Sequence, residues 1–336
     1  RPMAPTVRIR DLFRFWLPLQ ATWLMMSLEG PFLAAVIARL ADPKHNLAAY
    51  GVAFALAILV EAPVIMMMSA STALVDSRCN YRRLRHFMWI LNGGITVTML
   101  LLLFTPAWEL LTDRAMGLDP EVARLTWTSL LILLPWPAAI GYRRFYQGLL
   151  IRSGLTRRVA WGTVVRLGTM VLTALGMYHL TQAPGAWVGA AALSVGVVTE
   201  AVASRVMAAG TVRTFMATTA EKVMTYRGIW DFYLPLALTS TIALAVQPMV
   251  TFFMGVARFP LESLAVLPVV NSLVFIFRSP GLAYQEAAIT MLGRSWNNYP
   301  NVRRFAGILG LSSTLCLATI AYTPLAGVWL RGVSGL

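Results

Sequence analysis

The chain has 336 residues, of which 58% are hydrophobic and 12% charged, and its mean hydropathy is +0.67. Because a soluble domain carries about a quarter charged residues, this composition excludes a soluble protein and indicates a polytopic membrane protein. The formal net charge of +14 would suit a nucleic-acid-binding protein, but the basic residues lie in short segments between apolar runs, so we expect no nucleic-acid partner.

Nine apolar runs are long enough to cross a hydrocarbon core of about 30 Å as helices. They cover 13–40, 47–75, 87–106, 121–142, 159–179, 186–208, 230–256, 262–292 and 305–330. Strands of alternating polarity, which a membrane barrel needs, are missing from the sequence. We therefore predict an all-α polytopic membrane protein.

The basic residues concentrate in alternate segments between these runs. With the N-terminus inside, the cytosolic segments are the rich ones, including 8–14, 78–85, 143–158, 205–227 and 294–304. This is the positive-inside pattern. It predicts a cytoplasmic N-terminus in a bacterial inner membrane and contact with anionic lipids.

The chain also contains an internal duplication. Phe-Trp-Leu-Pro-Leu at 15–19 returns as Phe-Tyr-Leu-Pro-Leu at 232–236, an offset of 217 residues. At the same offset Pro31 falls on Pro248, and Pro63 falls on Pro280. Six runs precede the second copy, so both copies enter the membrane from the same side as parallel repeats.

The duplication predicts two six-helix lobes. Residues 1–210 form the N-terminal lobe (helices 1–6), 211–228 a cytosolic inter-lobe linker, and 229–336 an incomplete C-terminal lobe (helices 7–9). The second copy stops after its third helix, so we expect three further C-terminal helices beyond this sequence. The alternative is a nine-helix chain that completes itself by pairing.

Prolines recur at four places in the two copies. A helical proline loses its own hydrogen bond and clashes with the carbonyl four residues back. The carbonyls freed in this way belong to Ser27, Leu59, Leu244 and Ile276. Since freed backbone in a bilayer must face protein or water, we expect Pro31, Pro63, Pro248 and Pro280 to kink helices that line a cavity.

Charged side chains stand beside these prolines. Glu29 and Glu61 in the first copy correspond to Val246 and Arg278 in the second. A charged side chain inside the hydrocarbon core of the membrane costs at least about 2.5–3.5 kcal/mol on insertion scales, so each of these groups needs an ion-pair partner, a proton or contact with water. We predict that substrate binding or ion coupling uses Glu29, Glu61, Arg278, Gln247, Asn271 and Glu286.

Structural roles stay open for the same residues. Glu61 and Arg278 could form an ion pair that only fixes packing, and Glu29 could be a protonated acid bonded to the carbonyl that its own kink frees. Gln247 and Asn271 could be helix-packing groups. Nearer the cytosolic side, Glu200 could pair with Arg166 or with Arg205.

The sequence contains no motif typical of an enzyme or of a metal site. His45, His86 and His179 fall at helix ends or in loops, without an acid at a spacing that suggests a metal site or acid–base work. Cys79 and Cys316 face different environments, so we expect no disulfide. We predict no enzyme, no metal and no cofactor; a coupling ion, if one is used, would be H⁺ or Na⁺.

Several short motifs resemble a known superfamily of exporters. Arg-Arg-Phe-Tyr-Gln-Gly at 143–148 and Pro-Gly-Ala-Trp-Val-Gly-Ala-Ala at 184–191 resemble the fourth-helix exit and sixth-helix opening of multidrug and toxic compound extrusion (MATE) transporters. The segments 49–56, 233–238 and 262–267 resemble the progressive ankylosis (ANK) family more closely. Both belong to the multidrug/oligosaccharidyl-lipid/polysaccharide (MOP) exporters. The resemblance implies a twelve-helix, two-lobe transporter that works by alternating access.

The resemblance also bears on substrate and coupling. Pro31 matches the proline at which the first helix of MATE proteins bends, and Glu29 resembles the first-helix acid of other members. Sodium-coupled MATE members carry an acid in the seventh helix, where this chain has none after Asp231. ANK-like relatives are associated with export of small anions such as citrate, pyrophosphate or nucleotides, for which Arg278 would be a contact.

We predict a monomeric secondary active transporter that exports a small organic anion between two lobes. The alternatives are a flippase for a lipid-linked saccharide, which should have a more basic cavity, and MATE-type cation-coupled multidrug efflux. A non-transporting membrane scaffold, with Glu61 paired to Arg278 in a dry lobe interface, is the alternative from another functional class.

Overall fold

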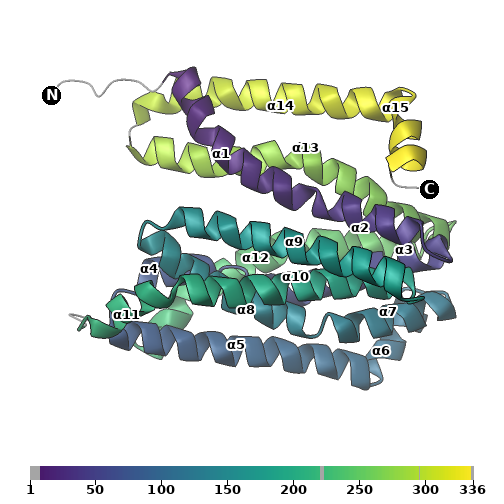
Figure 1. Cartoon of the computed structure of the whole chain (residues 1–336), viewed down its shortest axis with the longest axis horizontal. Coiled ribbons are helices and arrows are strands. Elements are labelled where there is room, and N and C mark those ends of the chain that lie inside the picture. Colours follow the sequence, from purple (N-terminus) through teal and green to yellow (C-terminus); the bar gives the residue numbers. More distant parts are fainter. Residues whose placement is uncertain (1–7, 220–222, 295, 334–336) are drawn as a thin grey trace. The chain divides into compact units, whose positions relative to one another are not determined.

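A computed structural model describes residues 8–219, 223–294 and 296–333. Over these residues the regular structure is helical throughout, which confirms the predicted fold class (Figure 1). Nine of the described helical stretches are long and apolar enough to cross a membrane. They coincide with the nine runs predicted from the sequence.

The helices follow one another with short connections. In chain order they are α1 (Ile9–Ser27), α2 (Glu29–Ala38), α3 (Pro43–Glu61), the 3₁₀ turn η1 (Ala62–Val64), α4 (Met67–Leu74), α5 (Arg78–Phe104), α6 (Ala107–Glu109), the π-helical η2 (Leu110–Ala115), α7 (Pro120–Ile132), α8 (Pro135–Arg152), α9 (Thr156–Leu180), α10 (Gly185–Met207), α11 (Ala209–Ala217), α12 (Tyr226–Gly255), α13 (Pro260–Arg294), the 3₁₀ turn η3 (Trp296–Asn298), α14 (Tyr299–Tyr322), α15 (Leu325–Gly327) and the π-helical η4 (Val328–Val333).

Two helices are longer at their arginine-rich ends than the hydropathy pattern predicts. The third span begins at Arg78 instead of residue 87, and the fourth continues to Arg152 instead of ending at 142. Backbone hydrogen bonding continues through polar residues, whereas a hydropathy pattern ends at the first arginines. Arg143 and Arg144, which the sequence placed in a cytosolic segment, therefore lie within a membrane-spanning helix.

The repeated prolines act differently in the two copies. In the first copy the helices break: α1 ends at Ser27 before Pro31, and α3 passes into the 3₁₀ turn η1 at Pro63. The Leu59 carbonyl accepts from the Ala62 N–H, a 3₁₀-type bond at this break. In the second copy α12 and α13 continue through Pro248 and Pro280.

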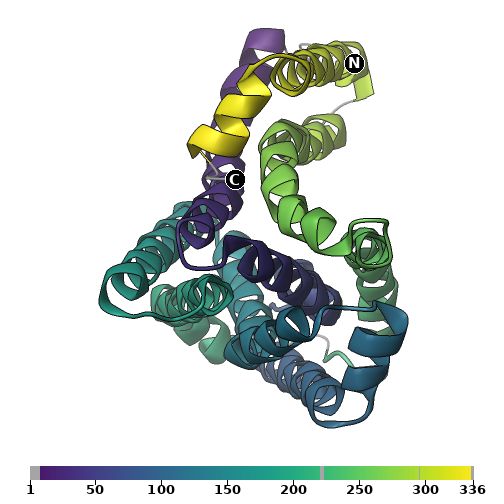
Figure 2. The same ribbon diagram turned by 90° about the vertical axis from the view of Figure 1, so that its right-hand side faces the viewer.

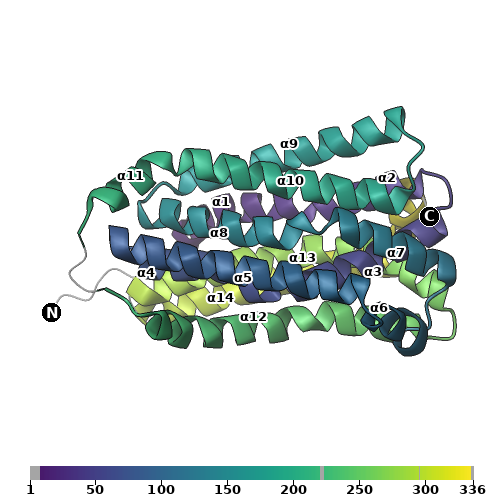
Figure 3. The ribbon, with the colours of Figure 1, turned by 90° about the horizontal axis from the view of Figure 1, so that it is seen from below.

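Contacts divide the chain into two compact units. The larger unit, Val36–Leu267, contains α3 to α12, and the smaller unit joins α1 and most of α2 to α14 and to α13 from Pro268 onward. Figure 2 shows the helices of the larger unit nearly end-on, side by side in one bundle. In Figure 3, α9 lies next to α10 along one edge of this unit, and α12 lies along the opposite edge.

Each unit combines helices from both copies of the duplication, because the first helix of each copy packs on the other copy. In the larger unit, the Tyr233 hydroxyl of α12 donates to the Pro63 carbonyl at 2.6 Å. In the smaller unit, the Trp16 Nε1–H of α1 donates to the Pro280 carbonyl at 3.2 Å. The offset of 217 residues maps Trp16 onto Tyr233 as well as Pro63 onto Pro280. The two bonds are therefore the same interaction made twice.

Neighbouring polar groups reinforce both contacts. Ser240 Oγ donates to the Ala62 carbonyl at 2.8 Å, and Gln20 Nε2 donates to Ser279 Oγ at 3.0 Å. Ser279 Oγ in turn donates to the Ile276 carbonyl, which Pro280 frees, at 2.8 Å. The second helix of each copy, which contains the repeated proline, is thus held by hydrogen-bond donors on the first helix of the other copy.

The predicted division of the duplicated chain into two lobes, 1–210 and 229–336, stays a prediction.

Each unit has its own apolar core. In the larger unit Tyr81, Phe145 and Tyr146 pack with Tyr233. In the smaller unit Trp16 lies edge-on to Phe305, with ring centroids 5.8 Å apart, among the alanines of α13. Tyr233 and Trp16, which donate to the proline carbonyls, are therefore also core residues.

The segment 211–228, predicted as a linker, is partly helical and is attached to α5. The helix α11 occupies it as far as Ala217. The Thr218 carbonyl accepts from the Arg78 N–H at 3.0 Å, and Asn80 Oδ1 accepts from the Met224 N–H at 2.9 Å. Both partners belong to the first turn of α5.

Replacing Tyr233 with Phe should destabilise the protein. The side chain is 1% exposed, so Tyr233→Phe removes the hydroxyl and leaves the Pro63 carbonyl without its donor, which costs about 1–3 kcal/mol. Thermal unfolding of the purified full chain measures the loss. The matched control is Tyr322→Phe at a position 90% exposed; equal melting temperatures for both variants would contradict the assigned role of the bond.

Candidate functional site

A cluster of charged and amide side chains lies inside the larger unit, and we call it the arginine–glutamate cluster. Its members come from α3, α8, α9 and α10 and are Glu61, Arg143, Arg144, Gln147, Arg166 and Glu200. Because Arg143 and Gln147 are four residues apart on α8, they share one helix face. All members except Arg144 are less than 9% exposed.

Glu200 is the centre of the cluster. Its Oε2 pairs with the Arg143 Nη1 and lies 3.6 Å from the Arg166 Nε. Its Oε1 accepts from the Gln147 Nε2 at 3.0 Å. Since Glu200 is 1% exposed, these partners replace the water that a carboxylate would otherwise need.

Glu61 stands at the last turn of α3 and belongs to the same electrostatic environment. The positive charges of Arg143, Arg144 and Arg166 act on its carboxyl group. The side chain is 6% exposed, and its Oε2 has no hydrogen-bond partner. Glu61 is therefore a buried acid whose hydrogen-bonding capacity is not filled.

Two glycines bring α8 close to the kinked segment that follows Glu61. A Cβ on Gly141 would lie 3.2 Å from the Val64 Cβ, and a Cβ on Gly148 would overlap the Met68 carbonyl. Between them on α8, Arg144 Nη1 contacts the Met68 sulfur at 3.7 Å. The absence of side chains at these glycines thus allows a cation to lie against the kink.

The structure places the six predicted site residues in different surroundings. In the larger unit Glu61 joins the cluster, and Gln247 is half-buried on α12. In the smaller unit Glu29 is half-buried at the first residue of α2, and Arg278 is exposed on α13. Glu286 lies on α13, and its side chain lies outside the described part of the structure.

Glu29 and Asn271 lie on helices that approach closely. A Cβ on Gly30 would lie 3.0 Å from the Ser272 Cβ, so the positions next to both candidates touch. The Asn271 Nδ2 is buried without a hydrogen-bond partner. The smaller unit therefore brings two of the predicted residues to one helix contact.

Sequence reasoning missed the role of α8. The residues Arg143, Arg144 and Gln147 were seen only as part of a motif at a helix exit, although the four-residue spacing of Arg143 and Gln147 indicates a shared helix face. Of the two partners proposed for Glu200, Arg166 is confirmed. Arg205 instead lies over the Tyr146 ring, 5.2 Å from its centroid.

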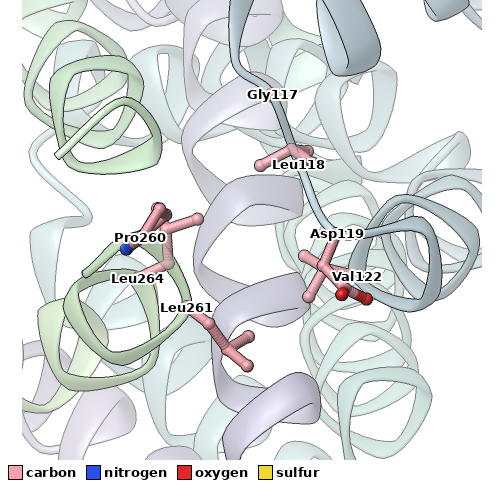
Figure 4. A pocket seen from close by; sticks show the side chains of 7 residues that line it. All are labelled: Gly117, Leu118, Asp119, Val122, Pro260, Leu261 and Leu264. Carbon is pink, nitrogen blue, oxygen red and sulfur yellow. The ribbon is translucent and has the colours of Figure 1, made fainter. Parts of the chain in front are cut away.

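A pocket of about 270 Å³ lies elsewhere in the larger unit (Figure 4). It lies between the segment that leads into α7 and the first turns of α13, and its lining is Gly117, Leu118, Asp119, Val122, Pro260, Leu261 and Leu264. None of these is a predicted site residue. The expectation that the proline kinks line a cavity stays a prediction.

Replacing Glu200 with Gln should destabilise the larger unit. The change removes the charge that compensates Arg143 and Arg166, and breaking a buried pair costs about 3–5 kcal/mol. Thermal unfolding of the purified full chain measures the effect. Arg157→Gln, at an exposed position of α9, is the control for loss of a charge; a Glu200→Gln variant as stable as this control would contradict the role of Glu200.

Solved structures of transporters share this arrangement of helices. A MATE protein in the bent conformation is 16% identical, with a TM-score of 0.66 over 98% of this chain and 76% of that chain. An outward-facing multidrug resistance MATE family transporter of the MOP superfamily is 16% identical, with a TM-score of 0.64 over 98% and 77%. An inward-facing one is 16% identical, with a TM-score of 0.62 over 94% and 74%.

No family model matches the sequence, and no curated protein matches it. The likeness to the solved structures therefore rests on the fold, and the similar structures are transporters, not enzymes. The predicted MATE-like fold is confirmed, whereas the finer resemblance to the ANK family is not supported by a comparison. The chain is a multi-pass membrane protein with the fold of the MATE transporters of the MOP superfamily.

Proposed function

We propose that this chain is a secondary active transporter that exports a small organic anion by alternating access. The similar solved structures include one MATE transporter facing inward and one facing outward. A fold that serves both states in those proteins suits a mechanism in which the binding site opens to each side in turn. The helix breaks near Pro31 and Pro63 supply points at which such a movement can occur.

The observation that carries the anionic substrate is the excess of positive charge in the arginine–glutamate cluster. Three arginines, Arg143, Arg144 and Arg166, stand against the two carboxyl groups of Glu61 and Glu200. Guanidinium groups bind carboxylates and phosphates through paired donors. A cluster with surplus arginine inside a membrane bundle is therefore suited to attract an anion.

The residues that we propose for binding or coupling remain Glu29, Glu61, Arg278, Gln247, Asn271 and Glu286. Arg278, two residues before Pro280 of α13, would contribute a cation outside the arginine–glutamate cluster. The Asn271 Nδ2, which has no hydrogen-bond partner, would contribute a hydrogen-bond donor. Glu29 and Glu61 would couple transport to H⁺ or Na⁺, because a charge change in the membrane interior shifts the balance between states. The ANK resemblance favours citrate, pyrophosphate or a nucleotide as substrate.

The proposed setting is a bacterial inner membrane, with a cytoplasmic N-terminus and a monomeric protein in contact with anionic lipids. The arginines between the helices support this orientation. A second candidate function is the flipping of a lipid-linked saccharide. The three arginines of the cluster support this candidate, since a phosphate-linked substrate needs a basic path.

Transport by the purified full chain in proteoliposomes should select small anions over cationic drugs. Glu61→Gln, which removes the acid that gains and loses the coupling proton, and Arg278→Gln, which removes a cation that would bind the anion, should each reduce anion efflux about tenfold or more. Arg157→Gln, with the same loss of charge at an exposed position, should leave efflux unchanged. Efflux of cationic drugs alone would favour a multidrug role and overturn the proposed substrate class.

A further inference from the structure

One cation of the arginine–glutamate cluster lacks a carboxylate partner. Arg143 and Arg166 both reach Glu200, whereas Arg144 makes no ion pair within the described residues. Its Nη1 contacts the Met68 sulfur at 3.7 Å, and its Nε has no partner. A thioether is a weak acceptor without charge, so the half-buried Arg144 keeps an unbalanced positive charge.

Glu61 is the complementary case. Its Oε2 is buried without a donor, and the groups that act on it are Arg143, Arg144 and Arg166. Glu200 is already engaged by three side chains. On α12, the Tyr233 hydroxyl is turned to the Pro63 carbonyl. Arg144 and Glu61 are therefore the two members of the cluster that remain available for a ligand.

Close packing of α8 on the segment that follows Glu61 brings Arg144 to Met68, and the Arg144 charge acts on the Glu61 carboxyl group. Gly141 and Gly148 flank Arg144 on α8 and contact Val64 and Met68 of the segment that follows Glu61. When Glu61 is ionised, its carboxylate supplies the negative charge that Arg144 needs. When Glu61 is protonated, that charge disappears and the guanidinium requires another anion.

We propose that Arg144 and Glu61 form a binding site for a small oxyanion, in which the ionised Glu61 competes with the ligand and protonation of Glu61 admits it. The ligand would carry a carboxylate, phosphate or sulfate group that matches the guanidinium donors. As a substrate site this rests on the proposed function, although binding itself does not require transport. The same chemistry could come from a free anion or from the headgroup of an anionic lipid.

Such a site makes proton and anion binding mutually favourable. By linkage, an anion that prefers protonated Glu61 raises the affinity for the proton by the factor by which the proton raises the affinity for the anion. Anion affinity should therefore increase as the pH falls. Protonated Glu61 and the bound anion would thus occur together in one state of the site.

Sulfate binding to the purified full chain, followed by calorimetry at about pH 6 and about pH 9, tests the proposal. Sulfate is a suitable probe because its own charge is constant over this range. The wild type should bind at least about tenfold more tightly at the lower pH, equivalent to about 1.4 kcal/mol. Affinity that is equal at both pH values, or greater at the higher pH, would overturn the proposal.

Three variants make the result specific. Glu61→Gln mimics the protonated acid and should bind sulfate at both pH values as the wild type does at the lower one. Arg144→Gln should lose binding at both, and Arg157→Gln at an exposed position of α9 should behave as the wild type. If Arg144→Gln fails to fold, the Glu61→Gln result still decides, because a pH dependence that survives in this variant contradicts the role of Glu61.

Lipid composition separates the two sources of the anion. In nanodiscs that contain phosphatidylglycerol, a headgroup bound at Arg144 should weaken sulfate binding relative to nanodiscs of phosphatidylcholine, whereas a site for free anions should give equal affinities. Either result supports the site. Binding as expected without any anion transport in proteoliposomes would refute the proposed function alone, and transport with pH-independent sulfate binding would refute this site alone.

Discussion

Proline in a membrane helix frees a backbone carbonyl, and the bilayer offers no water to satisfy it. The rest of this structure depends on how the two proline sites, Pro63 and Pro280, are held: the freed Leu59 carbonyl accepts from the Ala62 N–H, and the freed Ile276 carbonyl accepts from Ser279 Oγ. In each case an aromatic donor comes from the first helix of the other copy: Tyr233 to the Pro63 carbonyl and Trp16 to the Pro280 carbonyl. Because Tyr233 and Trp16 are core residues as well, their bonds to the carbonyls of Pro63 and Pro280 help to determine which helices pack together. Each compact unit is consequently built from both copies of the duplication.

The scaffold is symmetric, but its charges are not. The equivalent prolines and aromatic donors are kept in both copies, whereas the residue of the second copy that corresponds to Glu61 is Arg278. Glu61 is 6% exposed among three arginines, and Arg278 is exposed on α13. The two copies thus keep a proline at equivalent positions, Pro63 and Pro280, with an acid two residues before the first and a base two residues before the second.

Much of this fold could be predicted from the sequence, because hydropathy, the distribution of basic residues and the offset of 217 residues between the two copies can each be read directly from the order of the residues. The nine spans and the breaks near Pro31 and Pro63 follow from these. Glu61 was identifiable as a buried acid by its position beside a proline. Its neighbours were not, since Arg143 and Arg144 follow an apolar run and look like the start of a loop until the helix is seen to continue to Arg152. The pairing of Glu200 with Arg143 and the exchange of aromatic donors depend on packing between distant helices, which hydropathy does not encode.

The central claim is that this fold moves a small anion by alternating access, and entrance counterflow tests it most directly. Proteoliposomes that contain the full chain are loaded with unlabelled anion and placed in a trace of the labelled one. The account predicts a transient accumulation of label above its outside concentration, because a site that opens to each side in turn exchanges one anion for another. Uptake no greater than in protein-free liposomes, across carboxylate and phosphate anions, would contradict it.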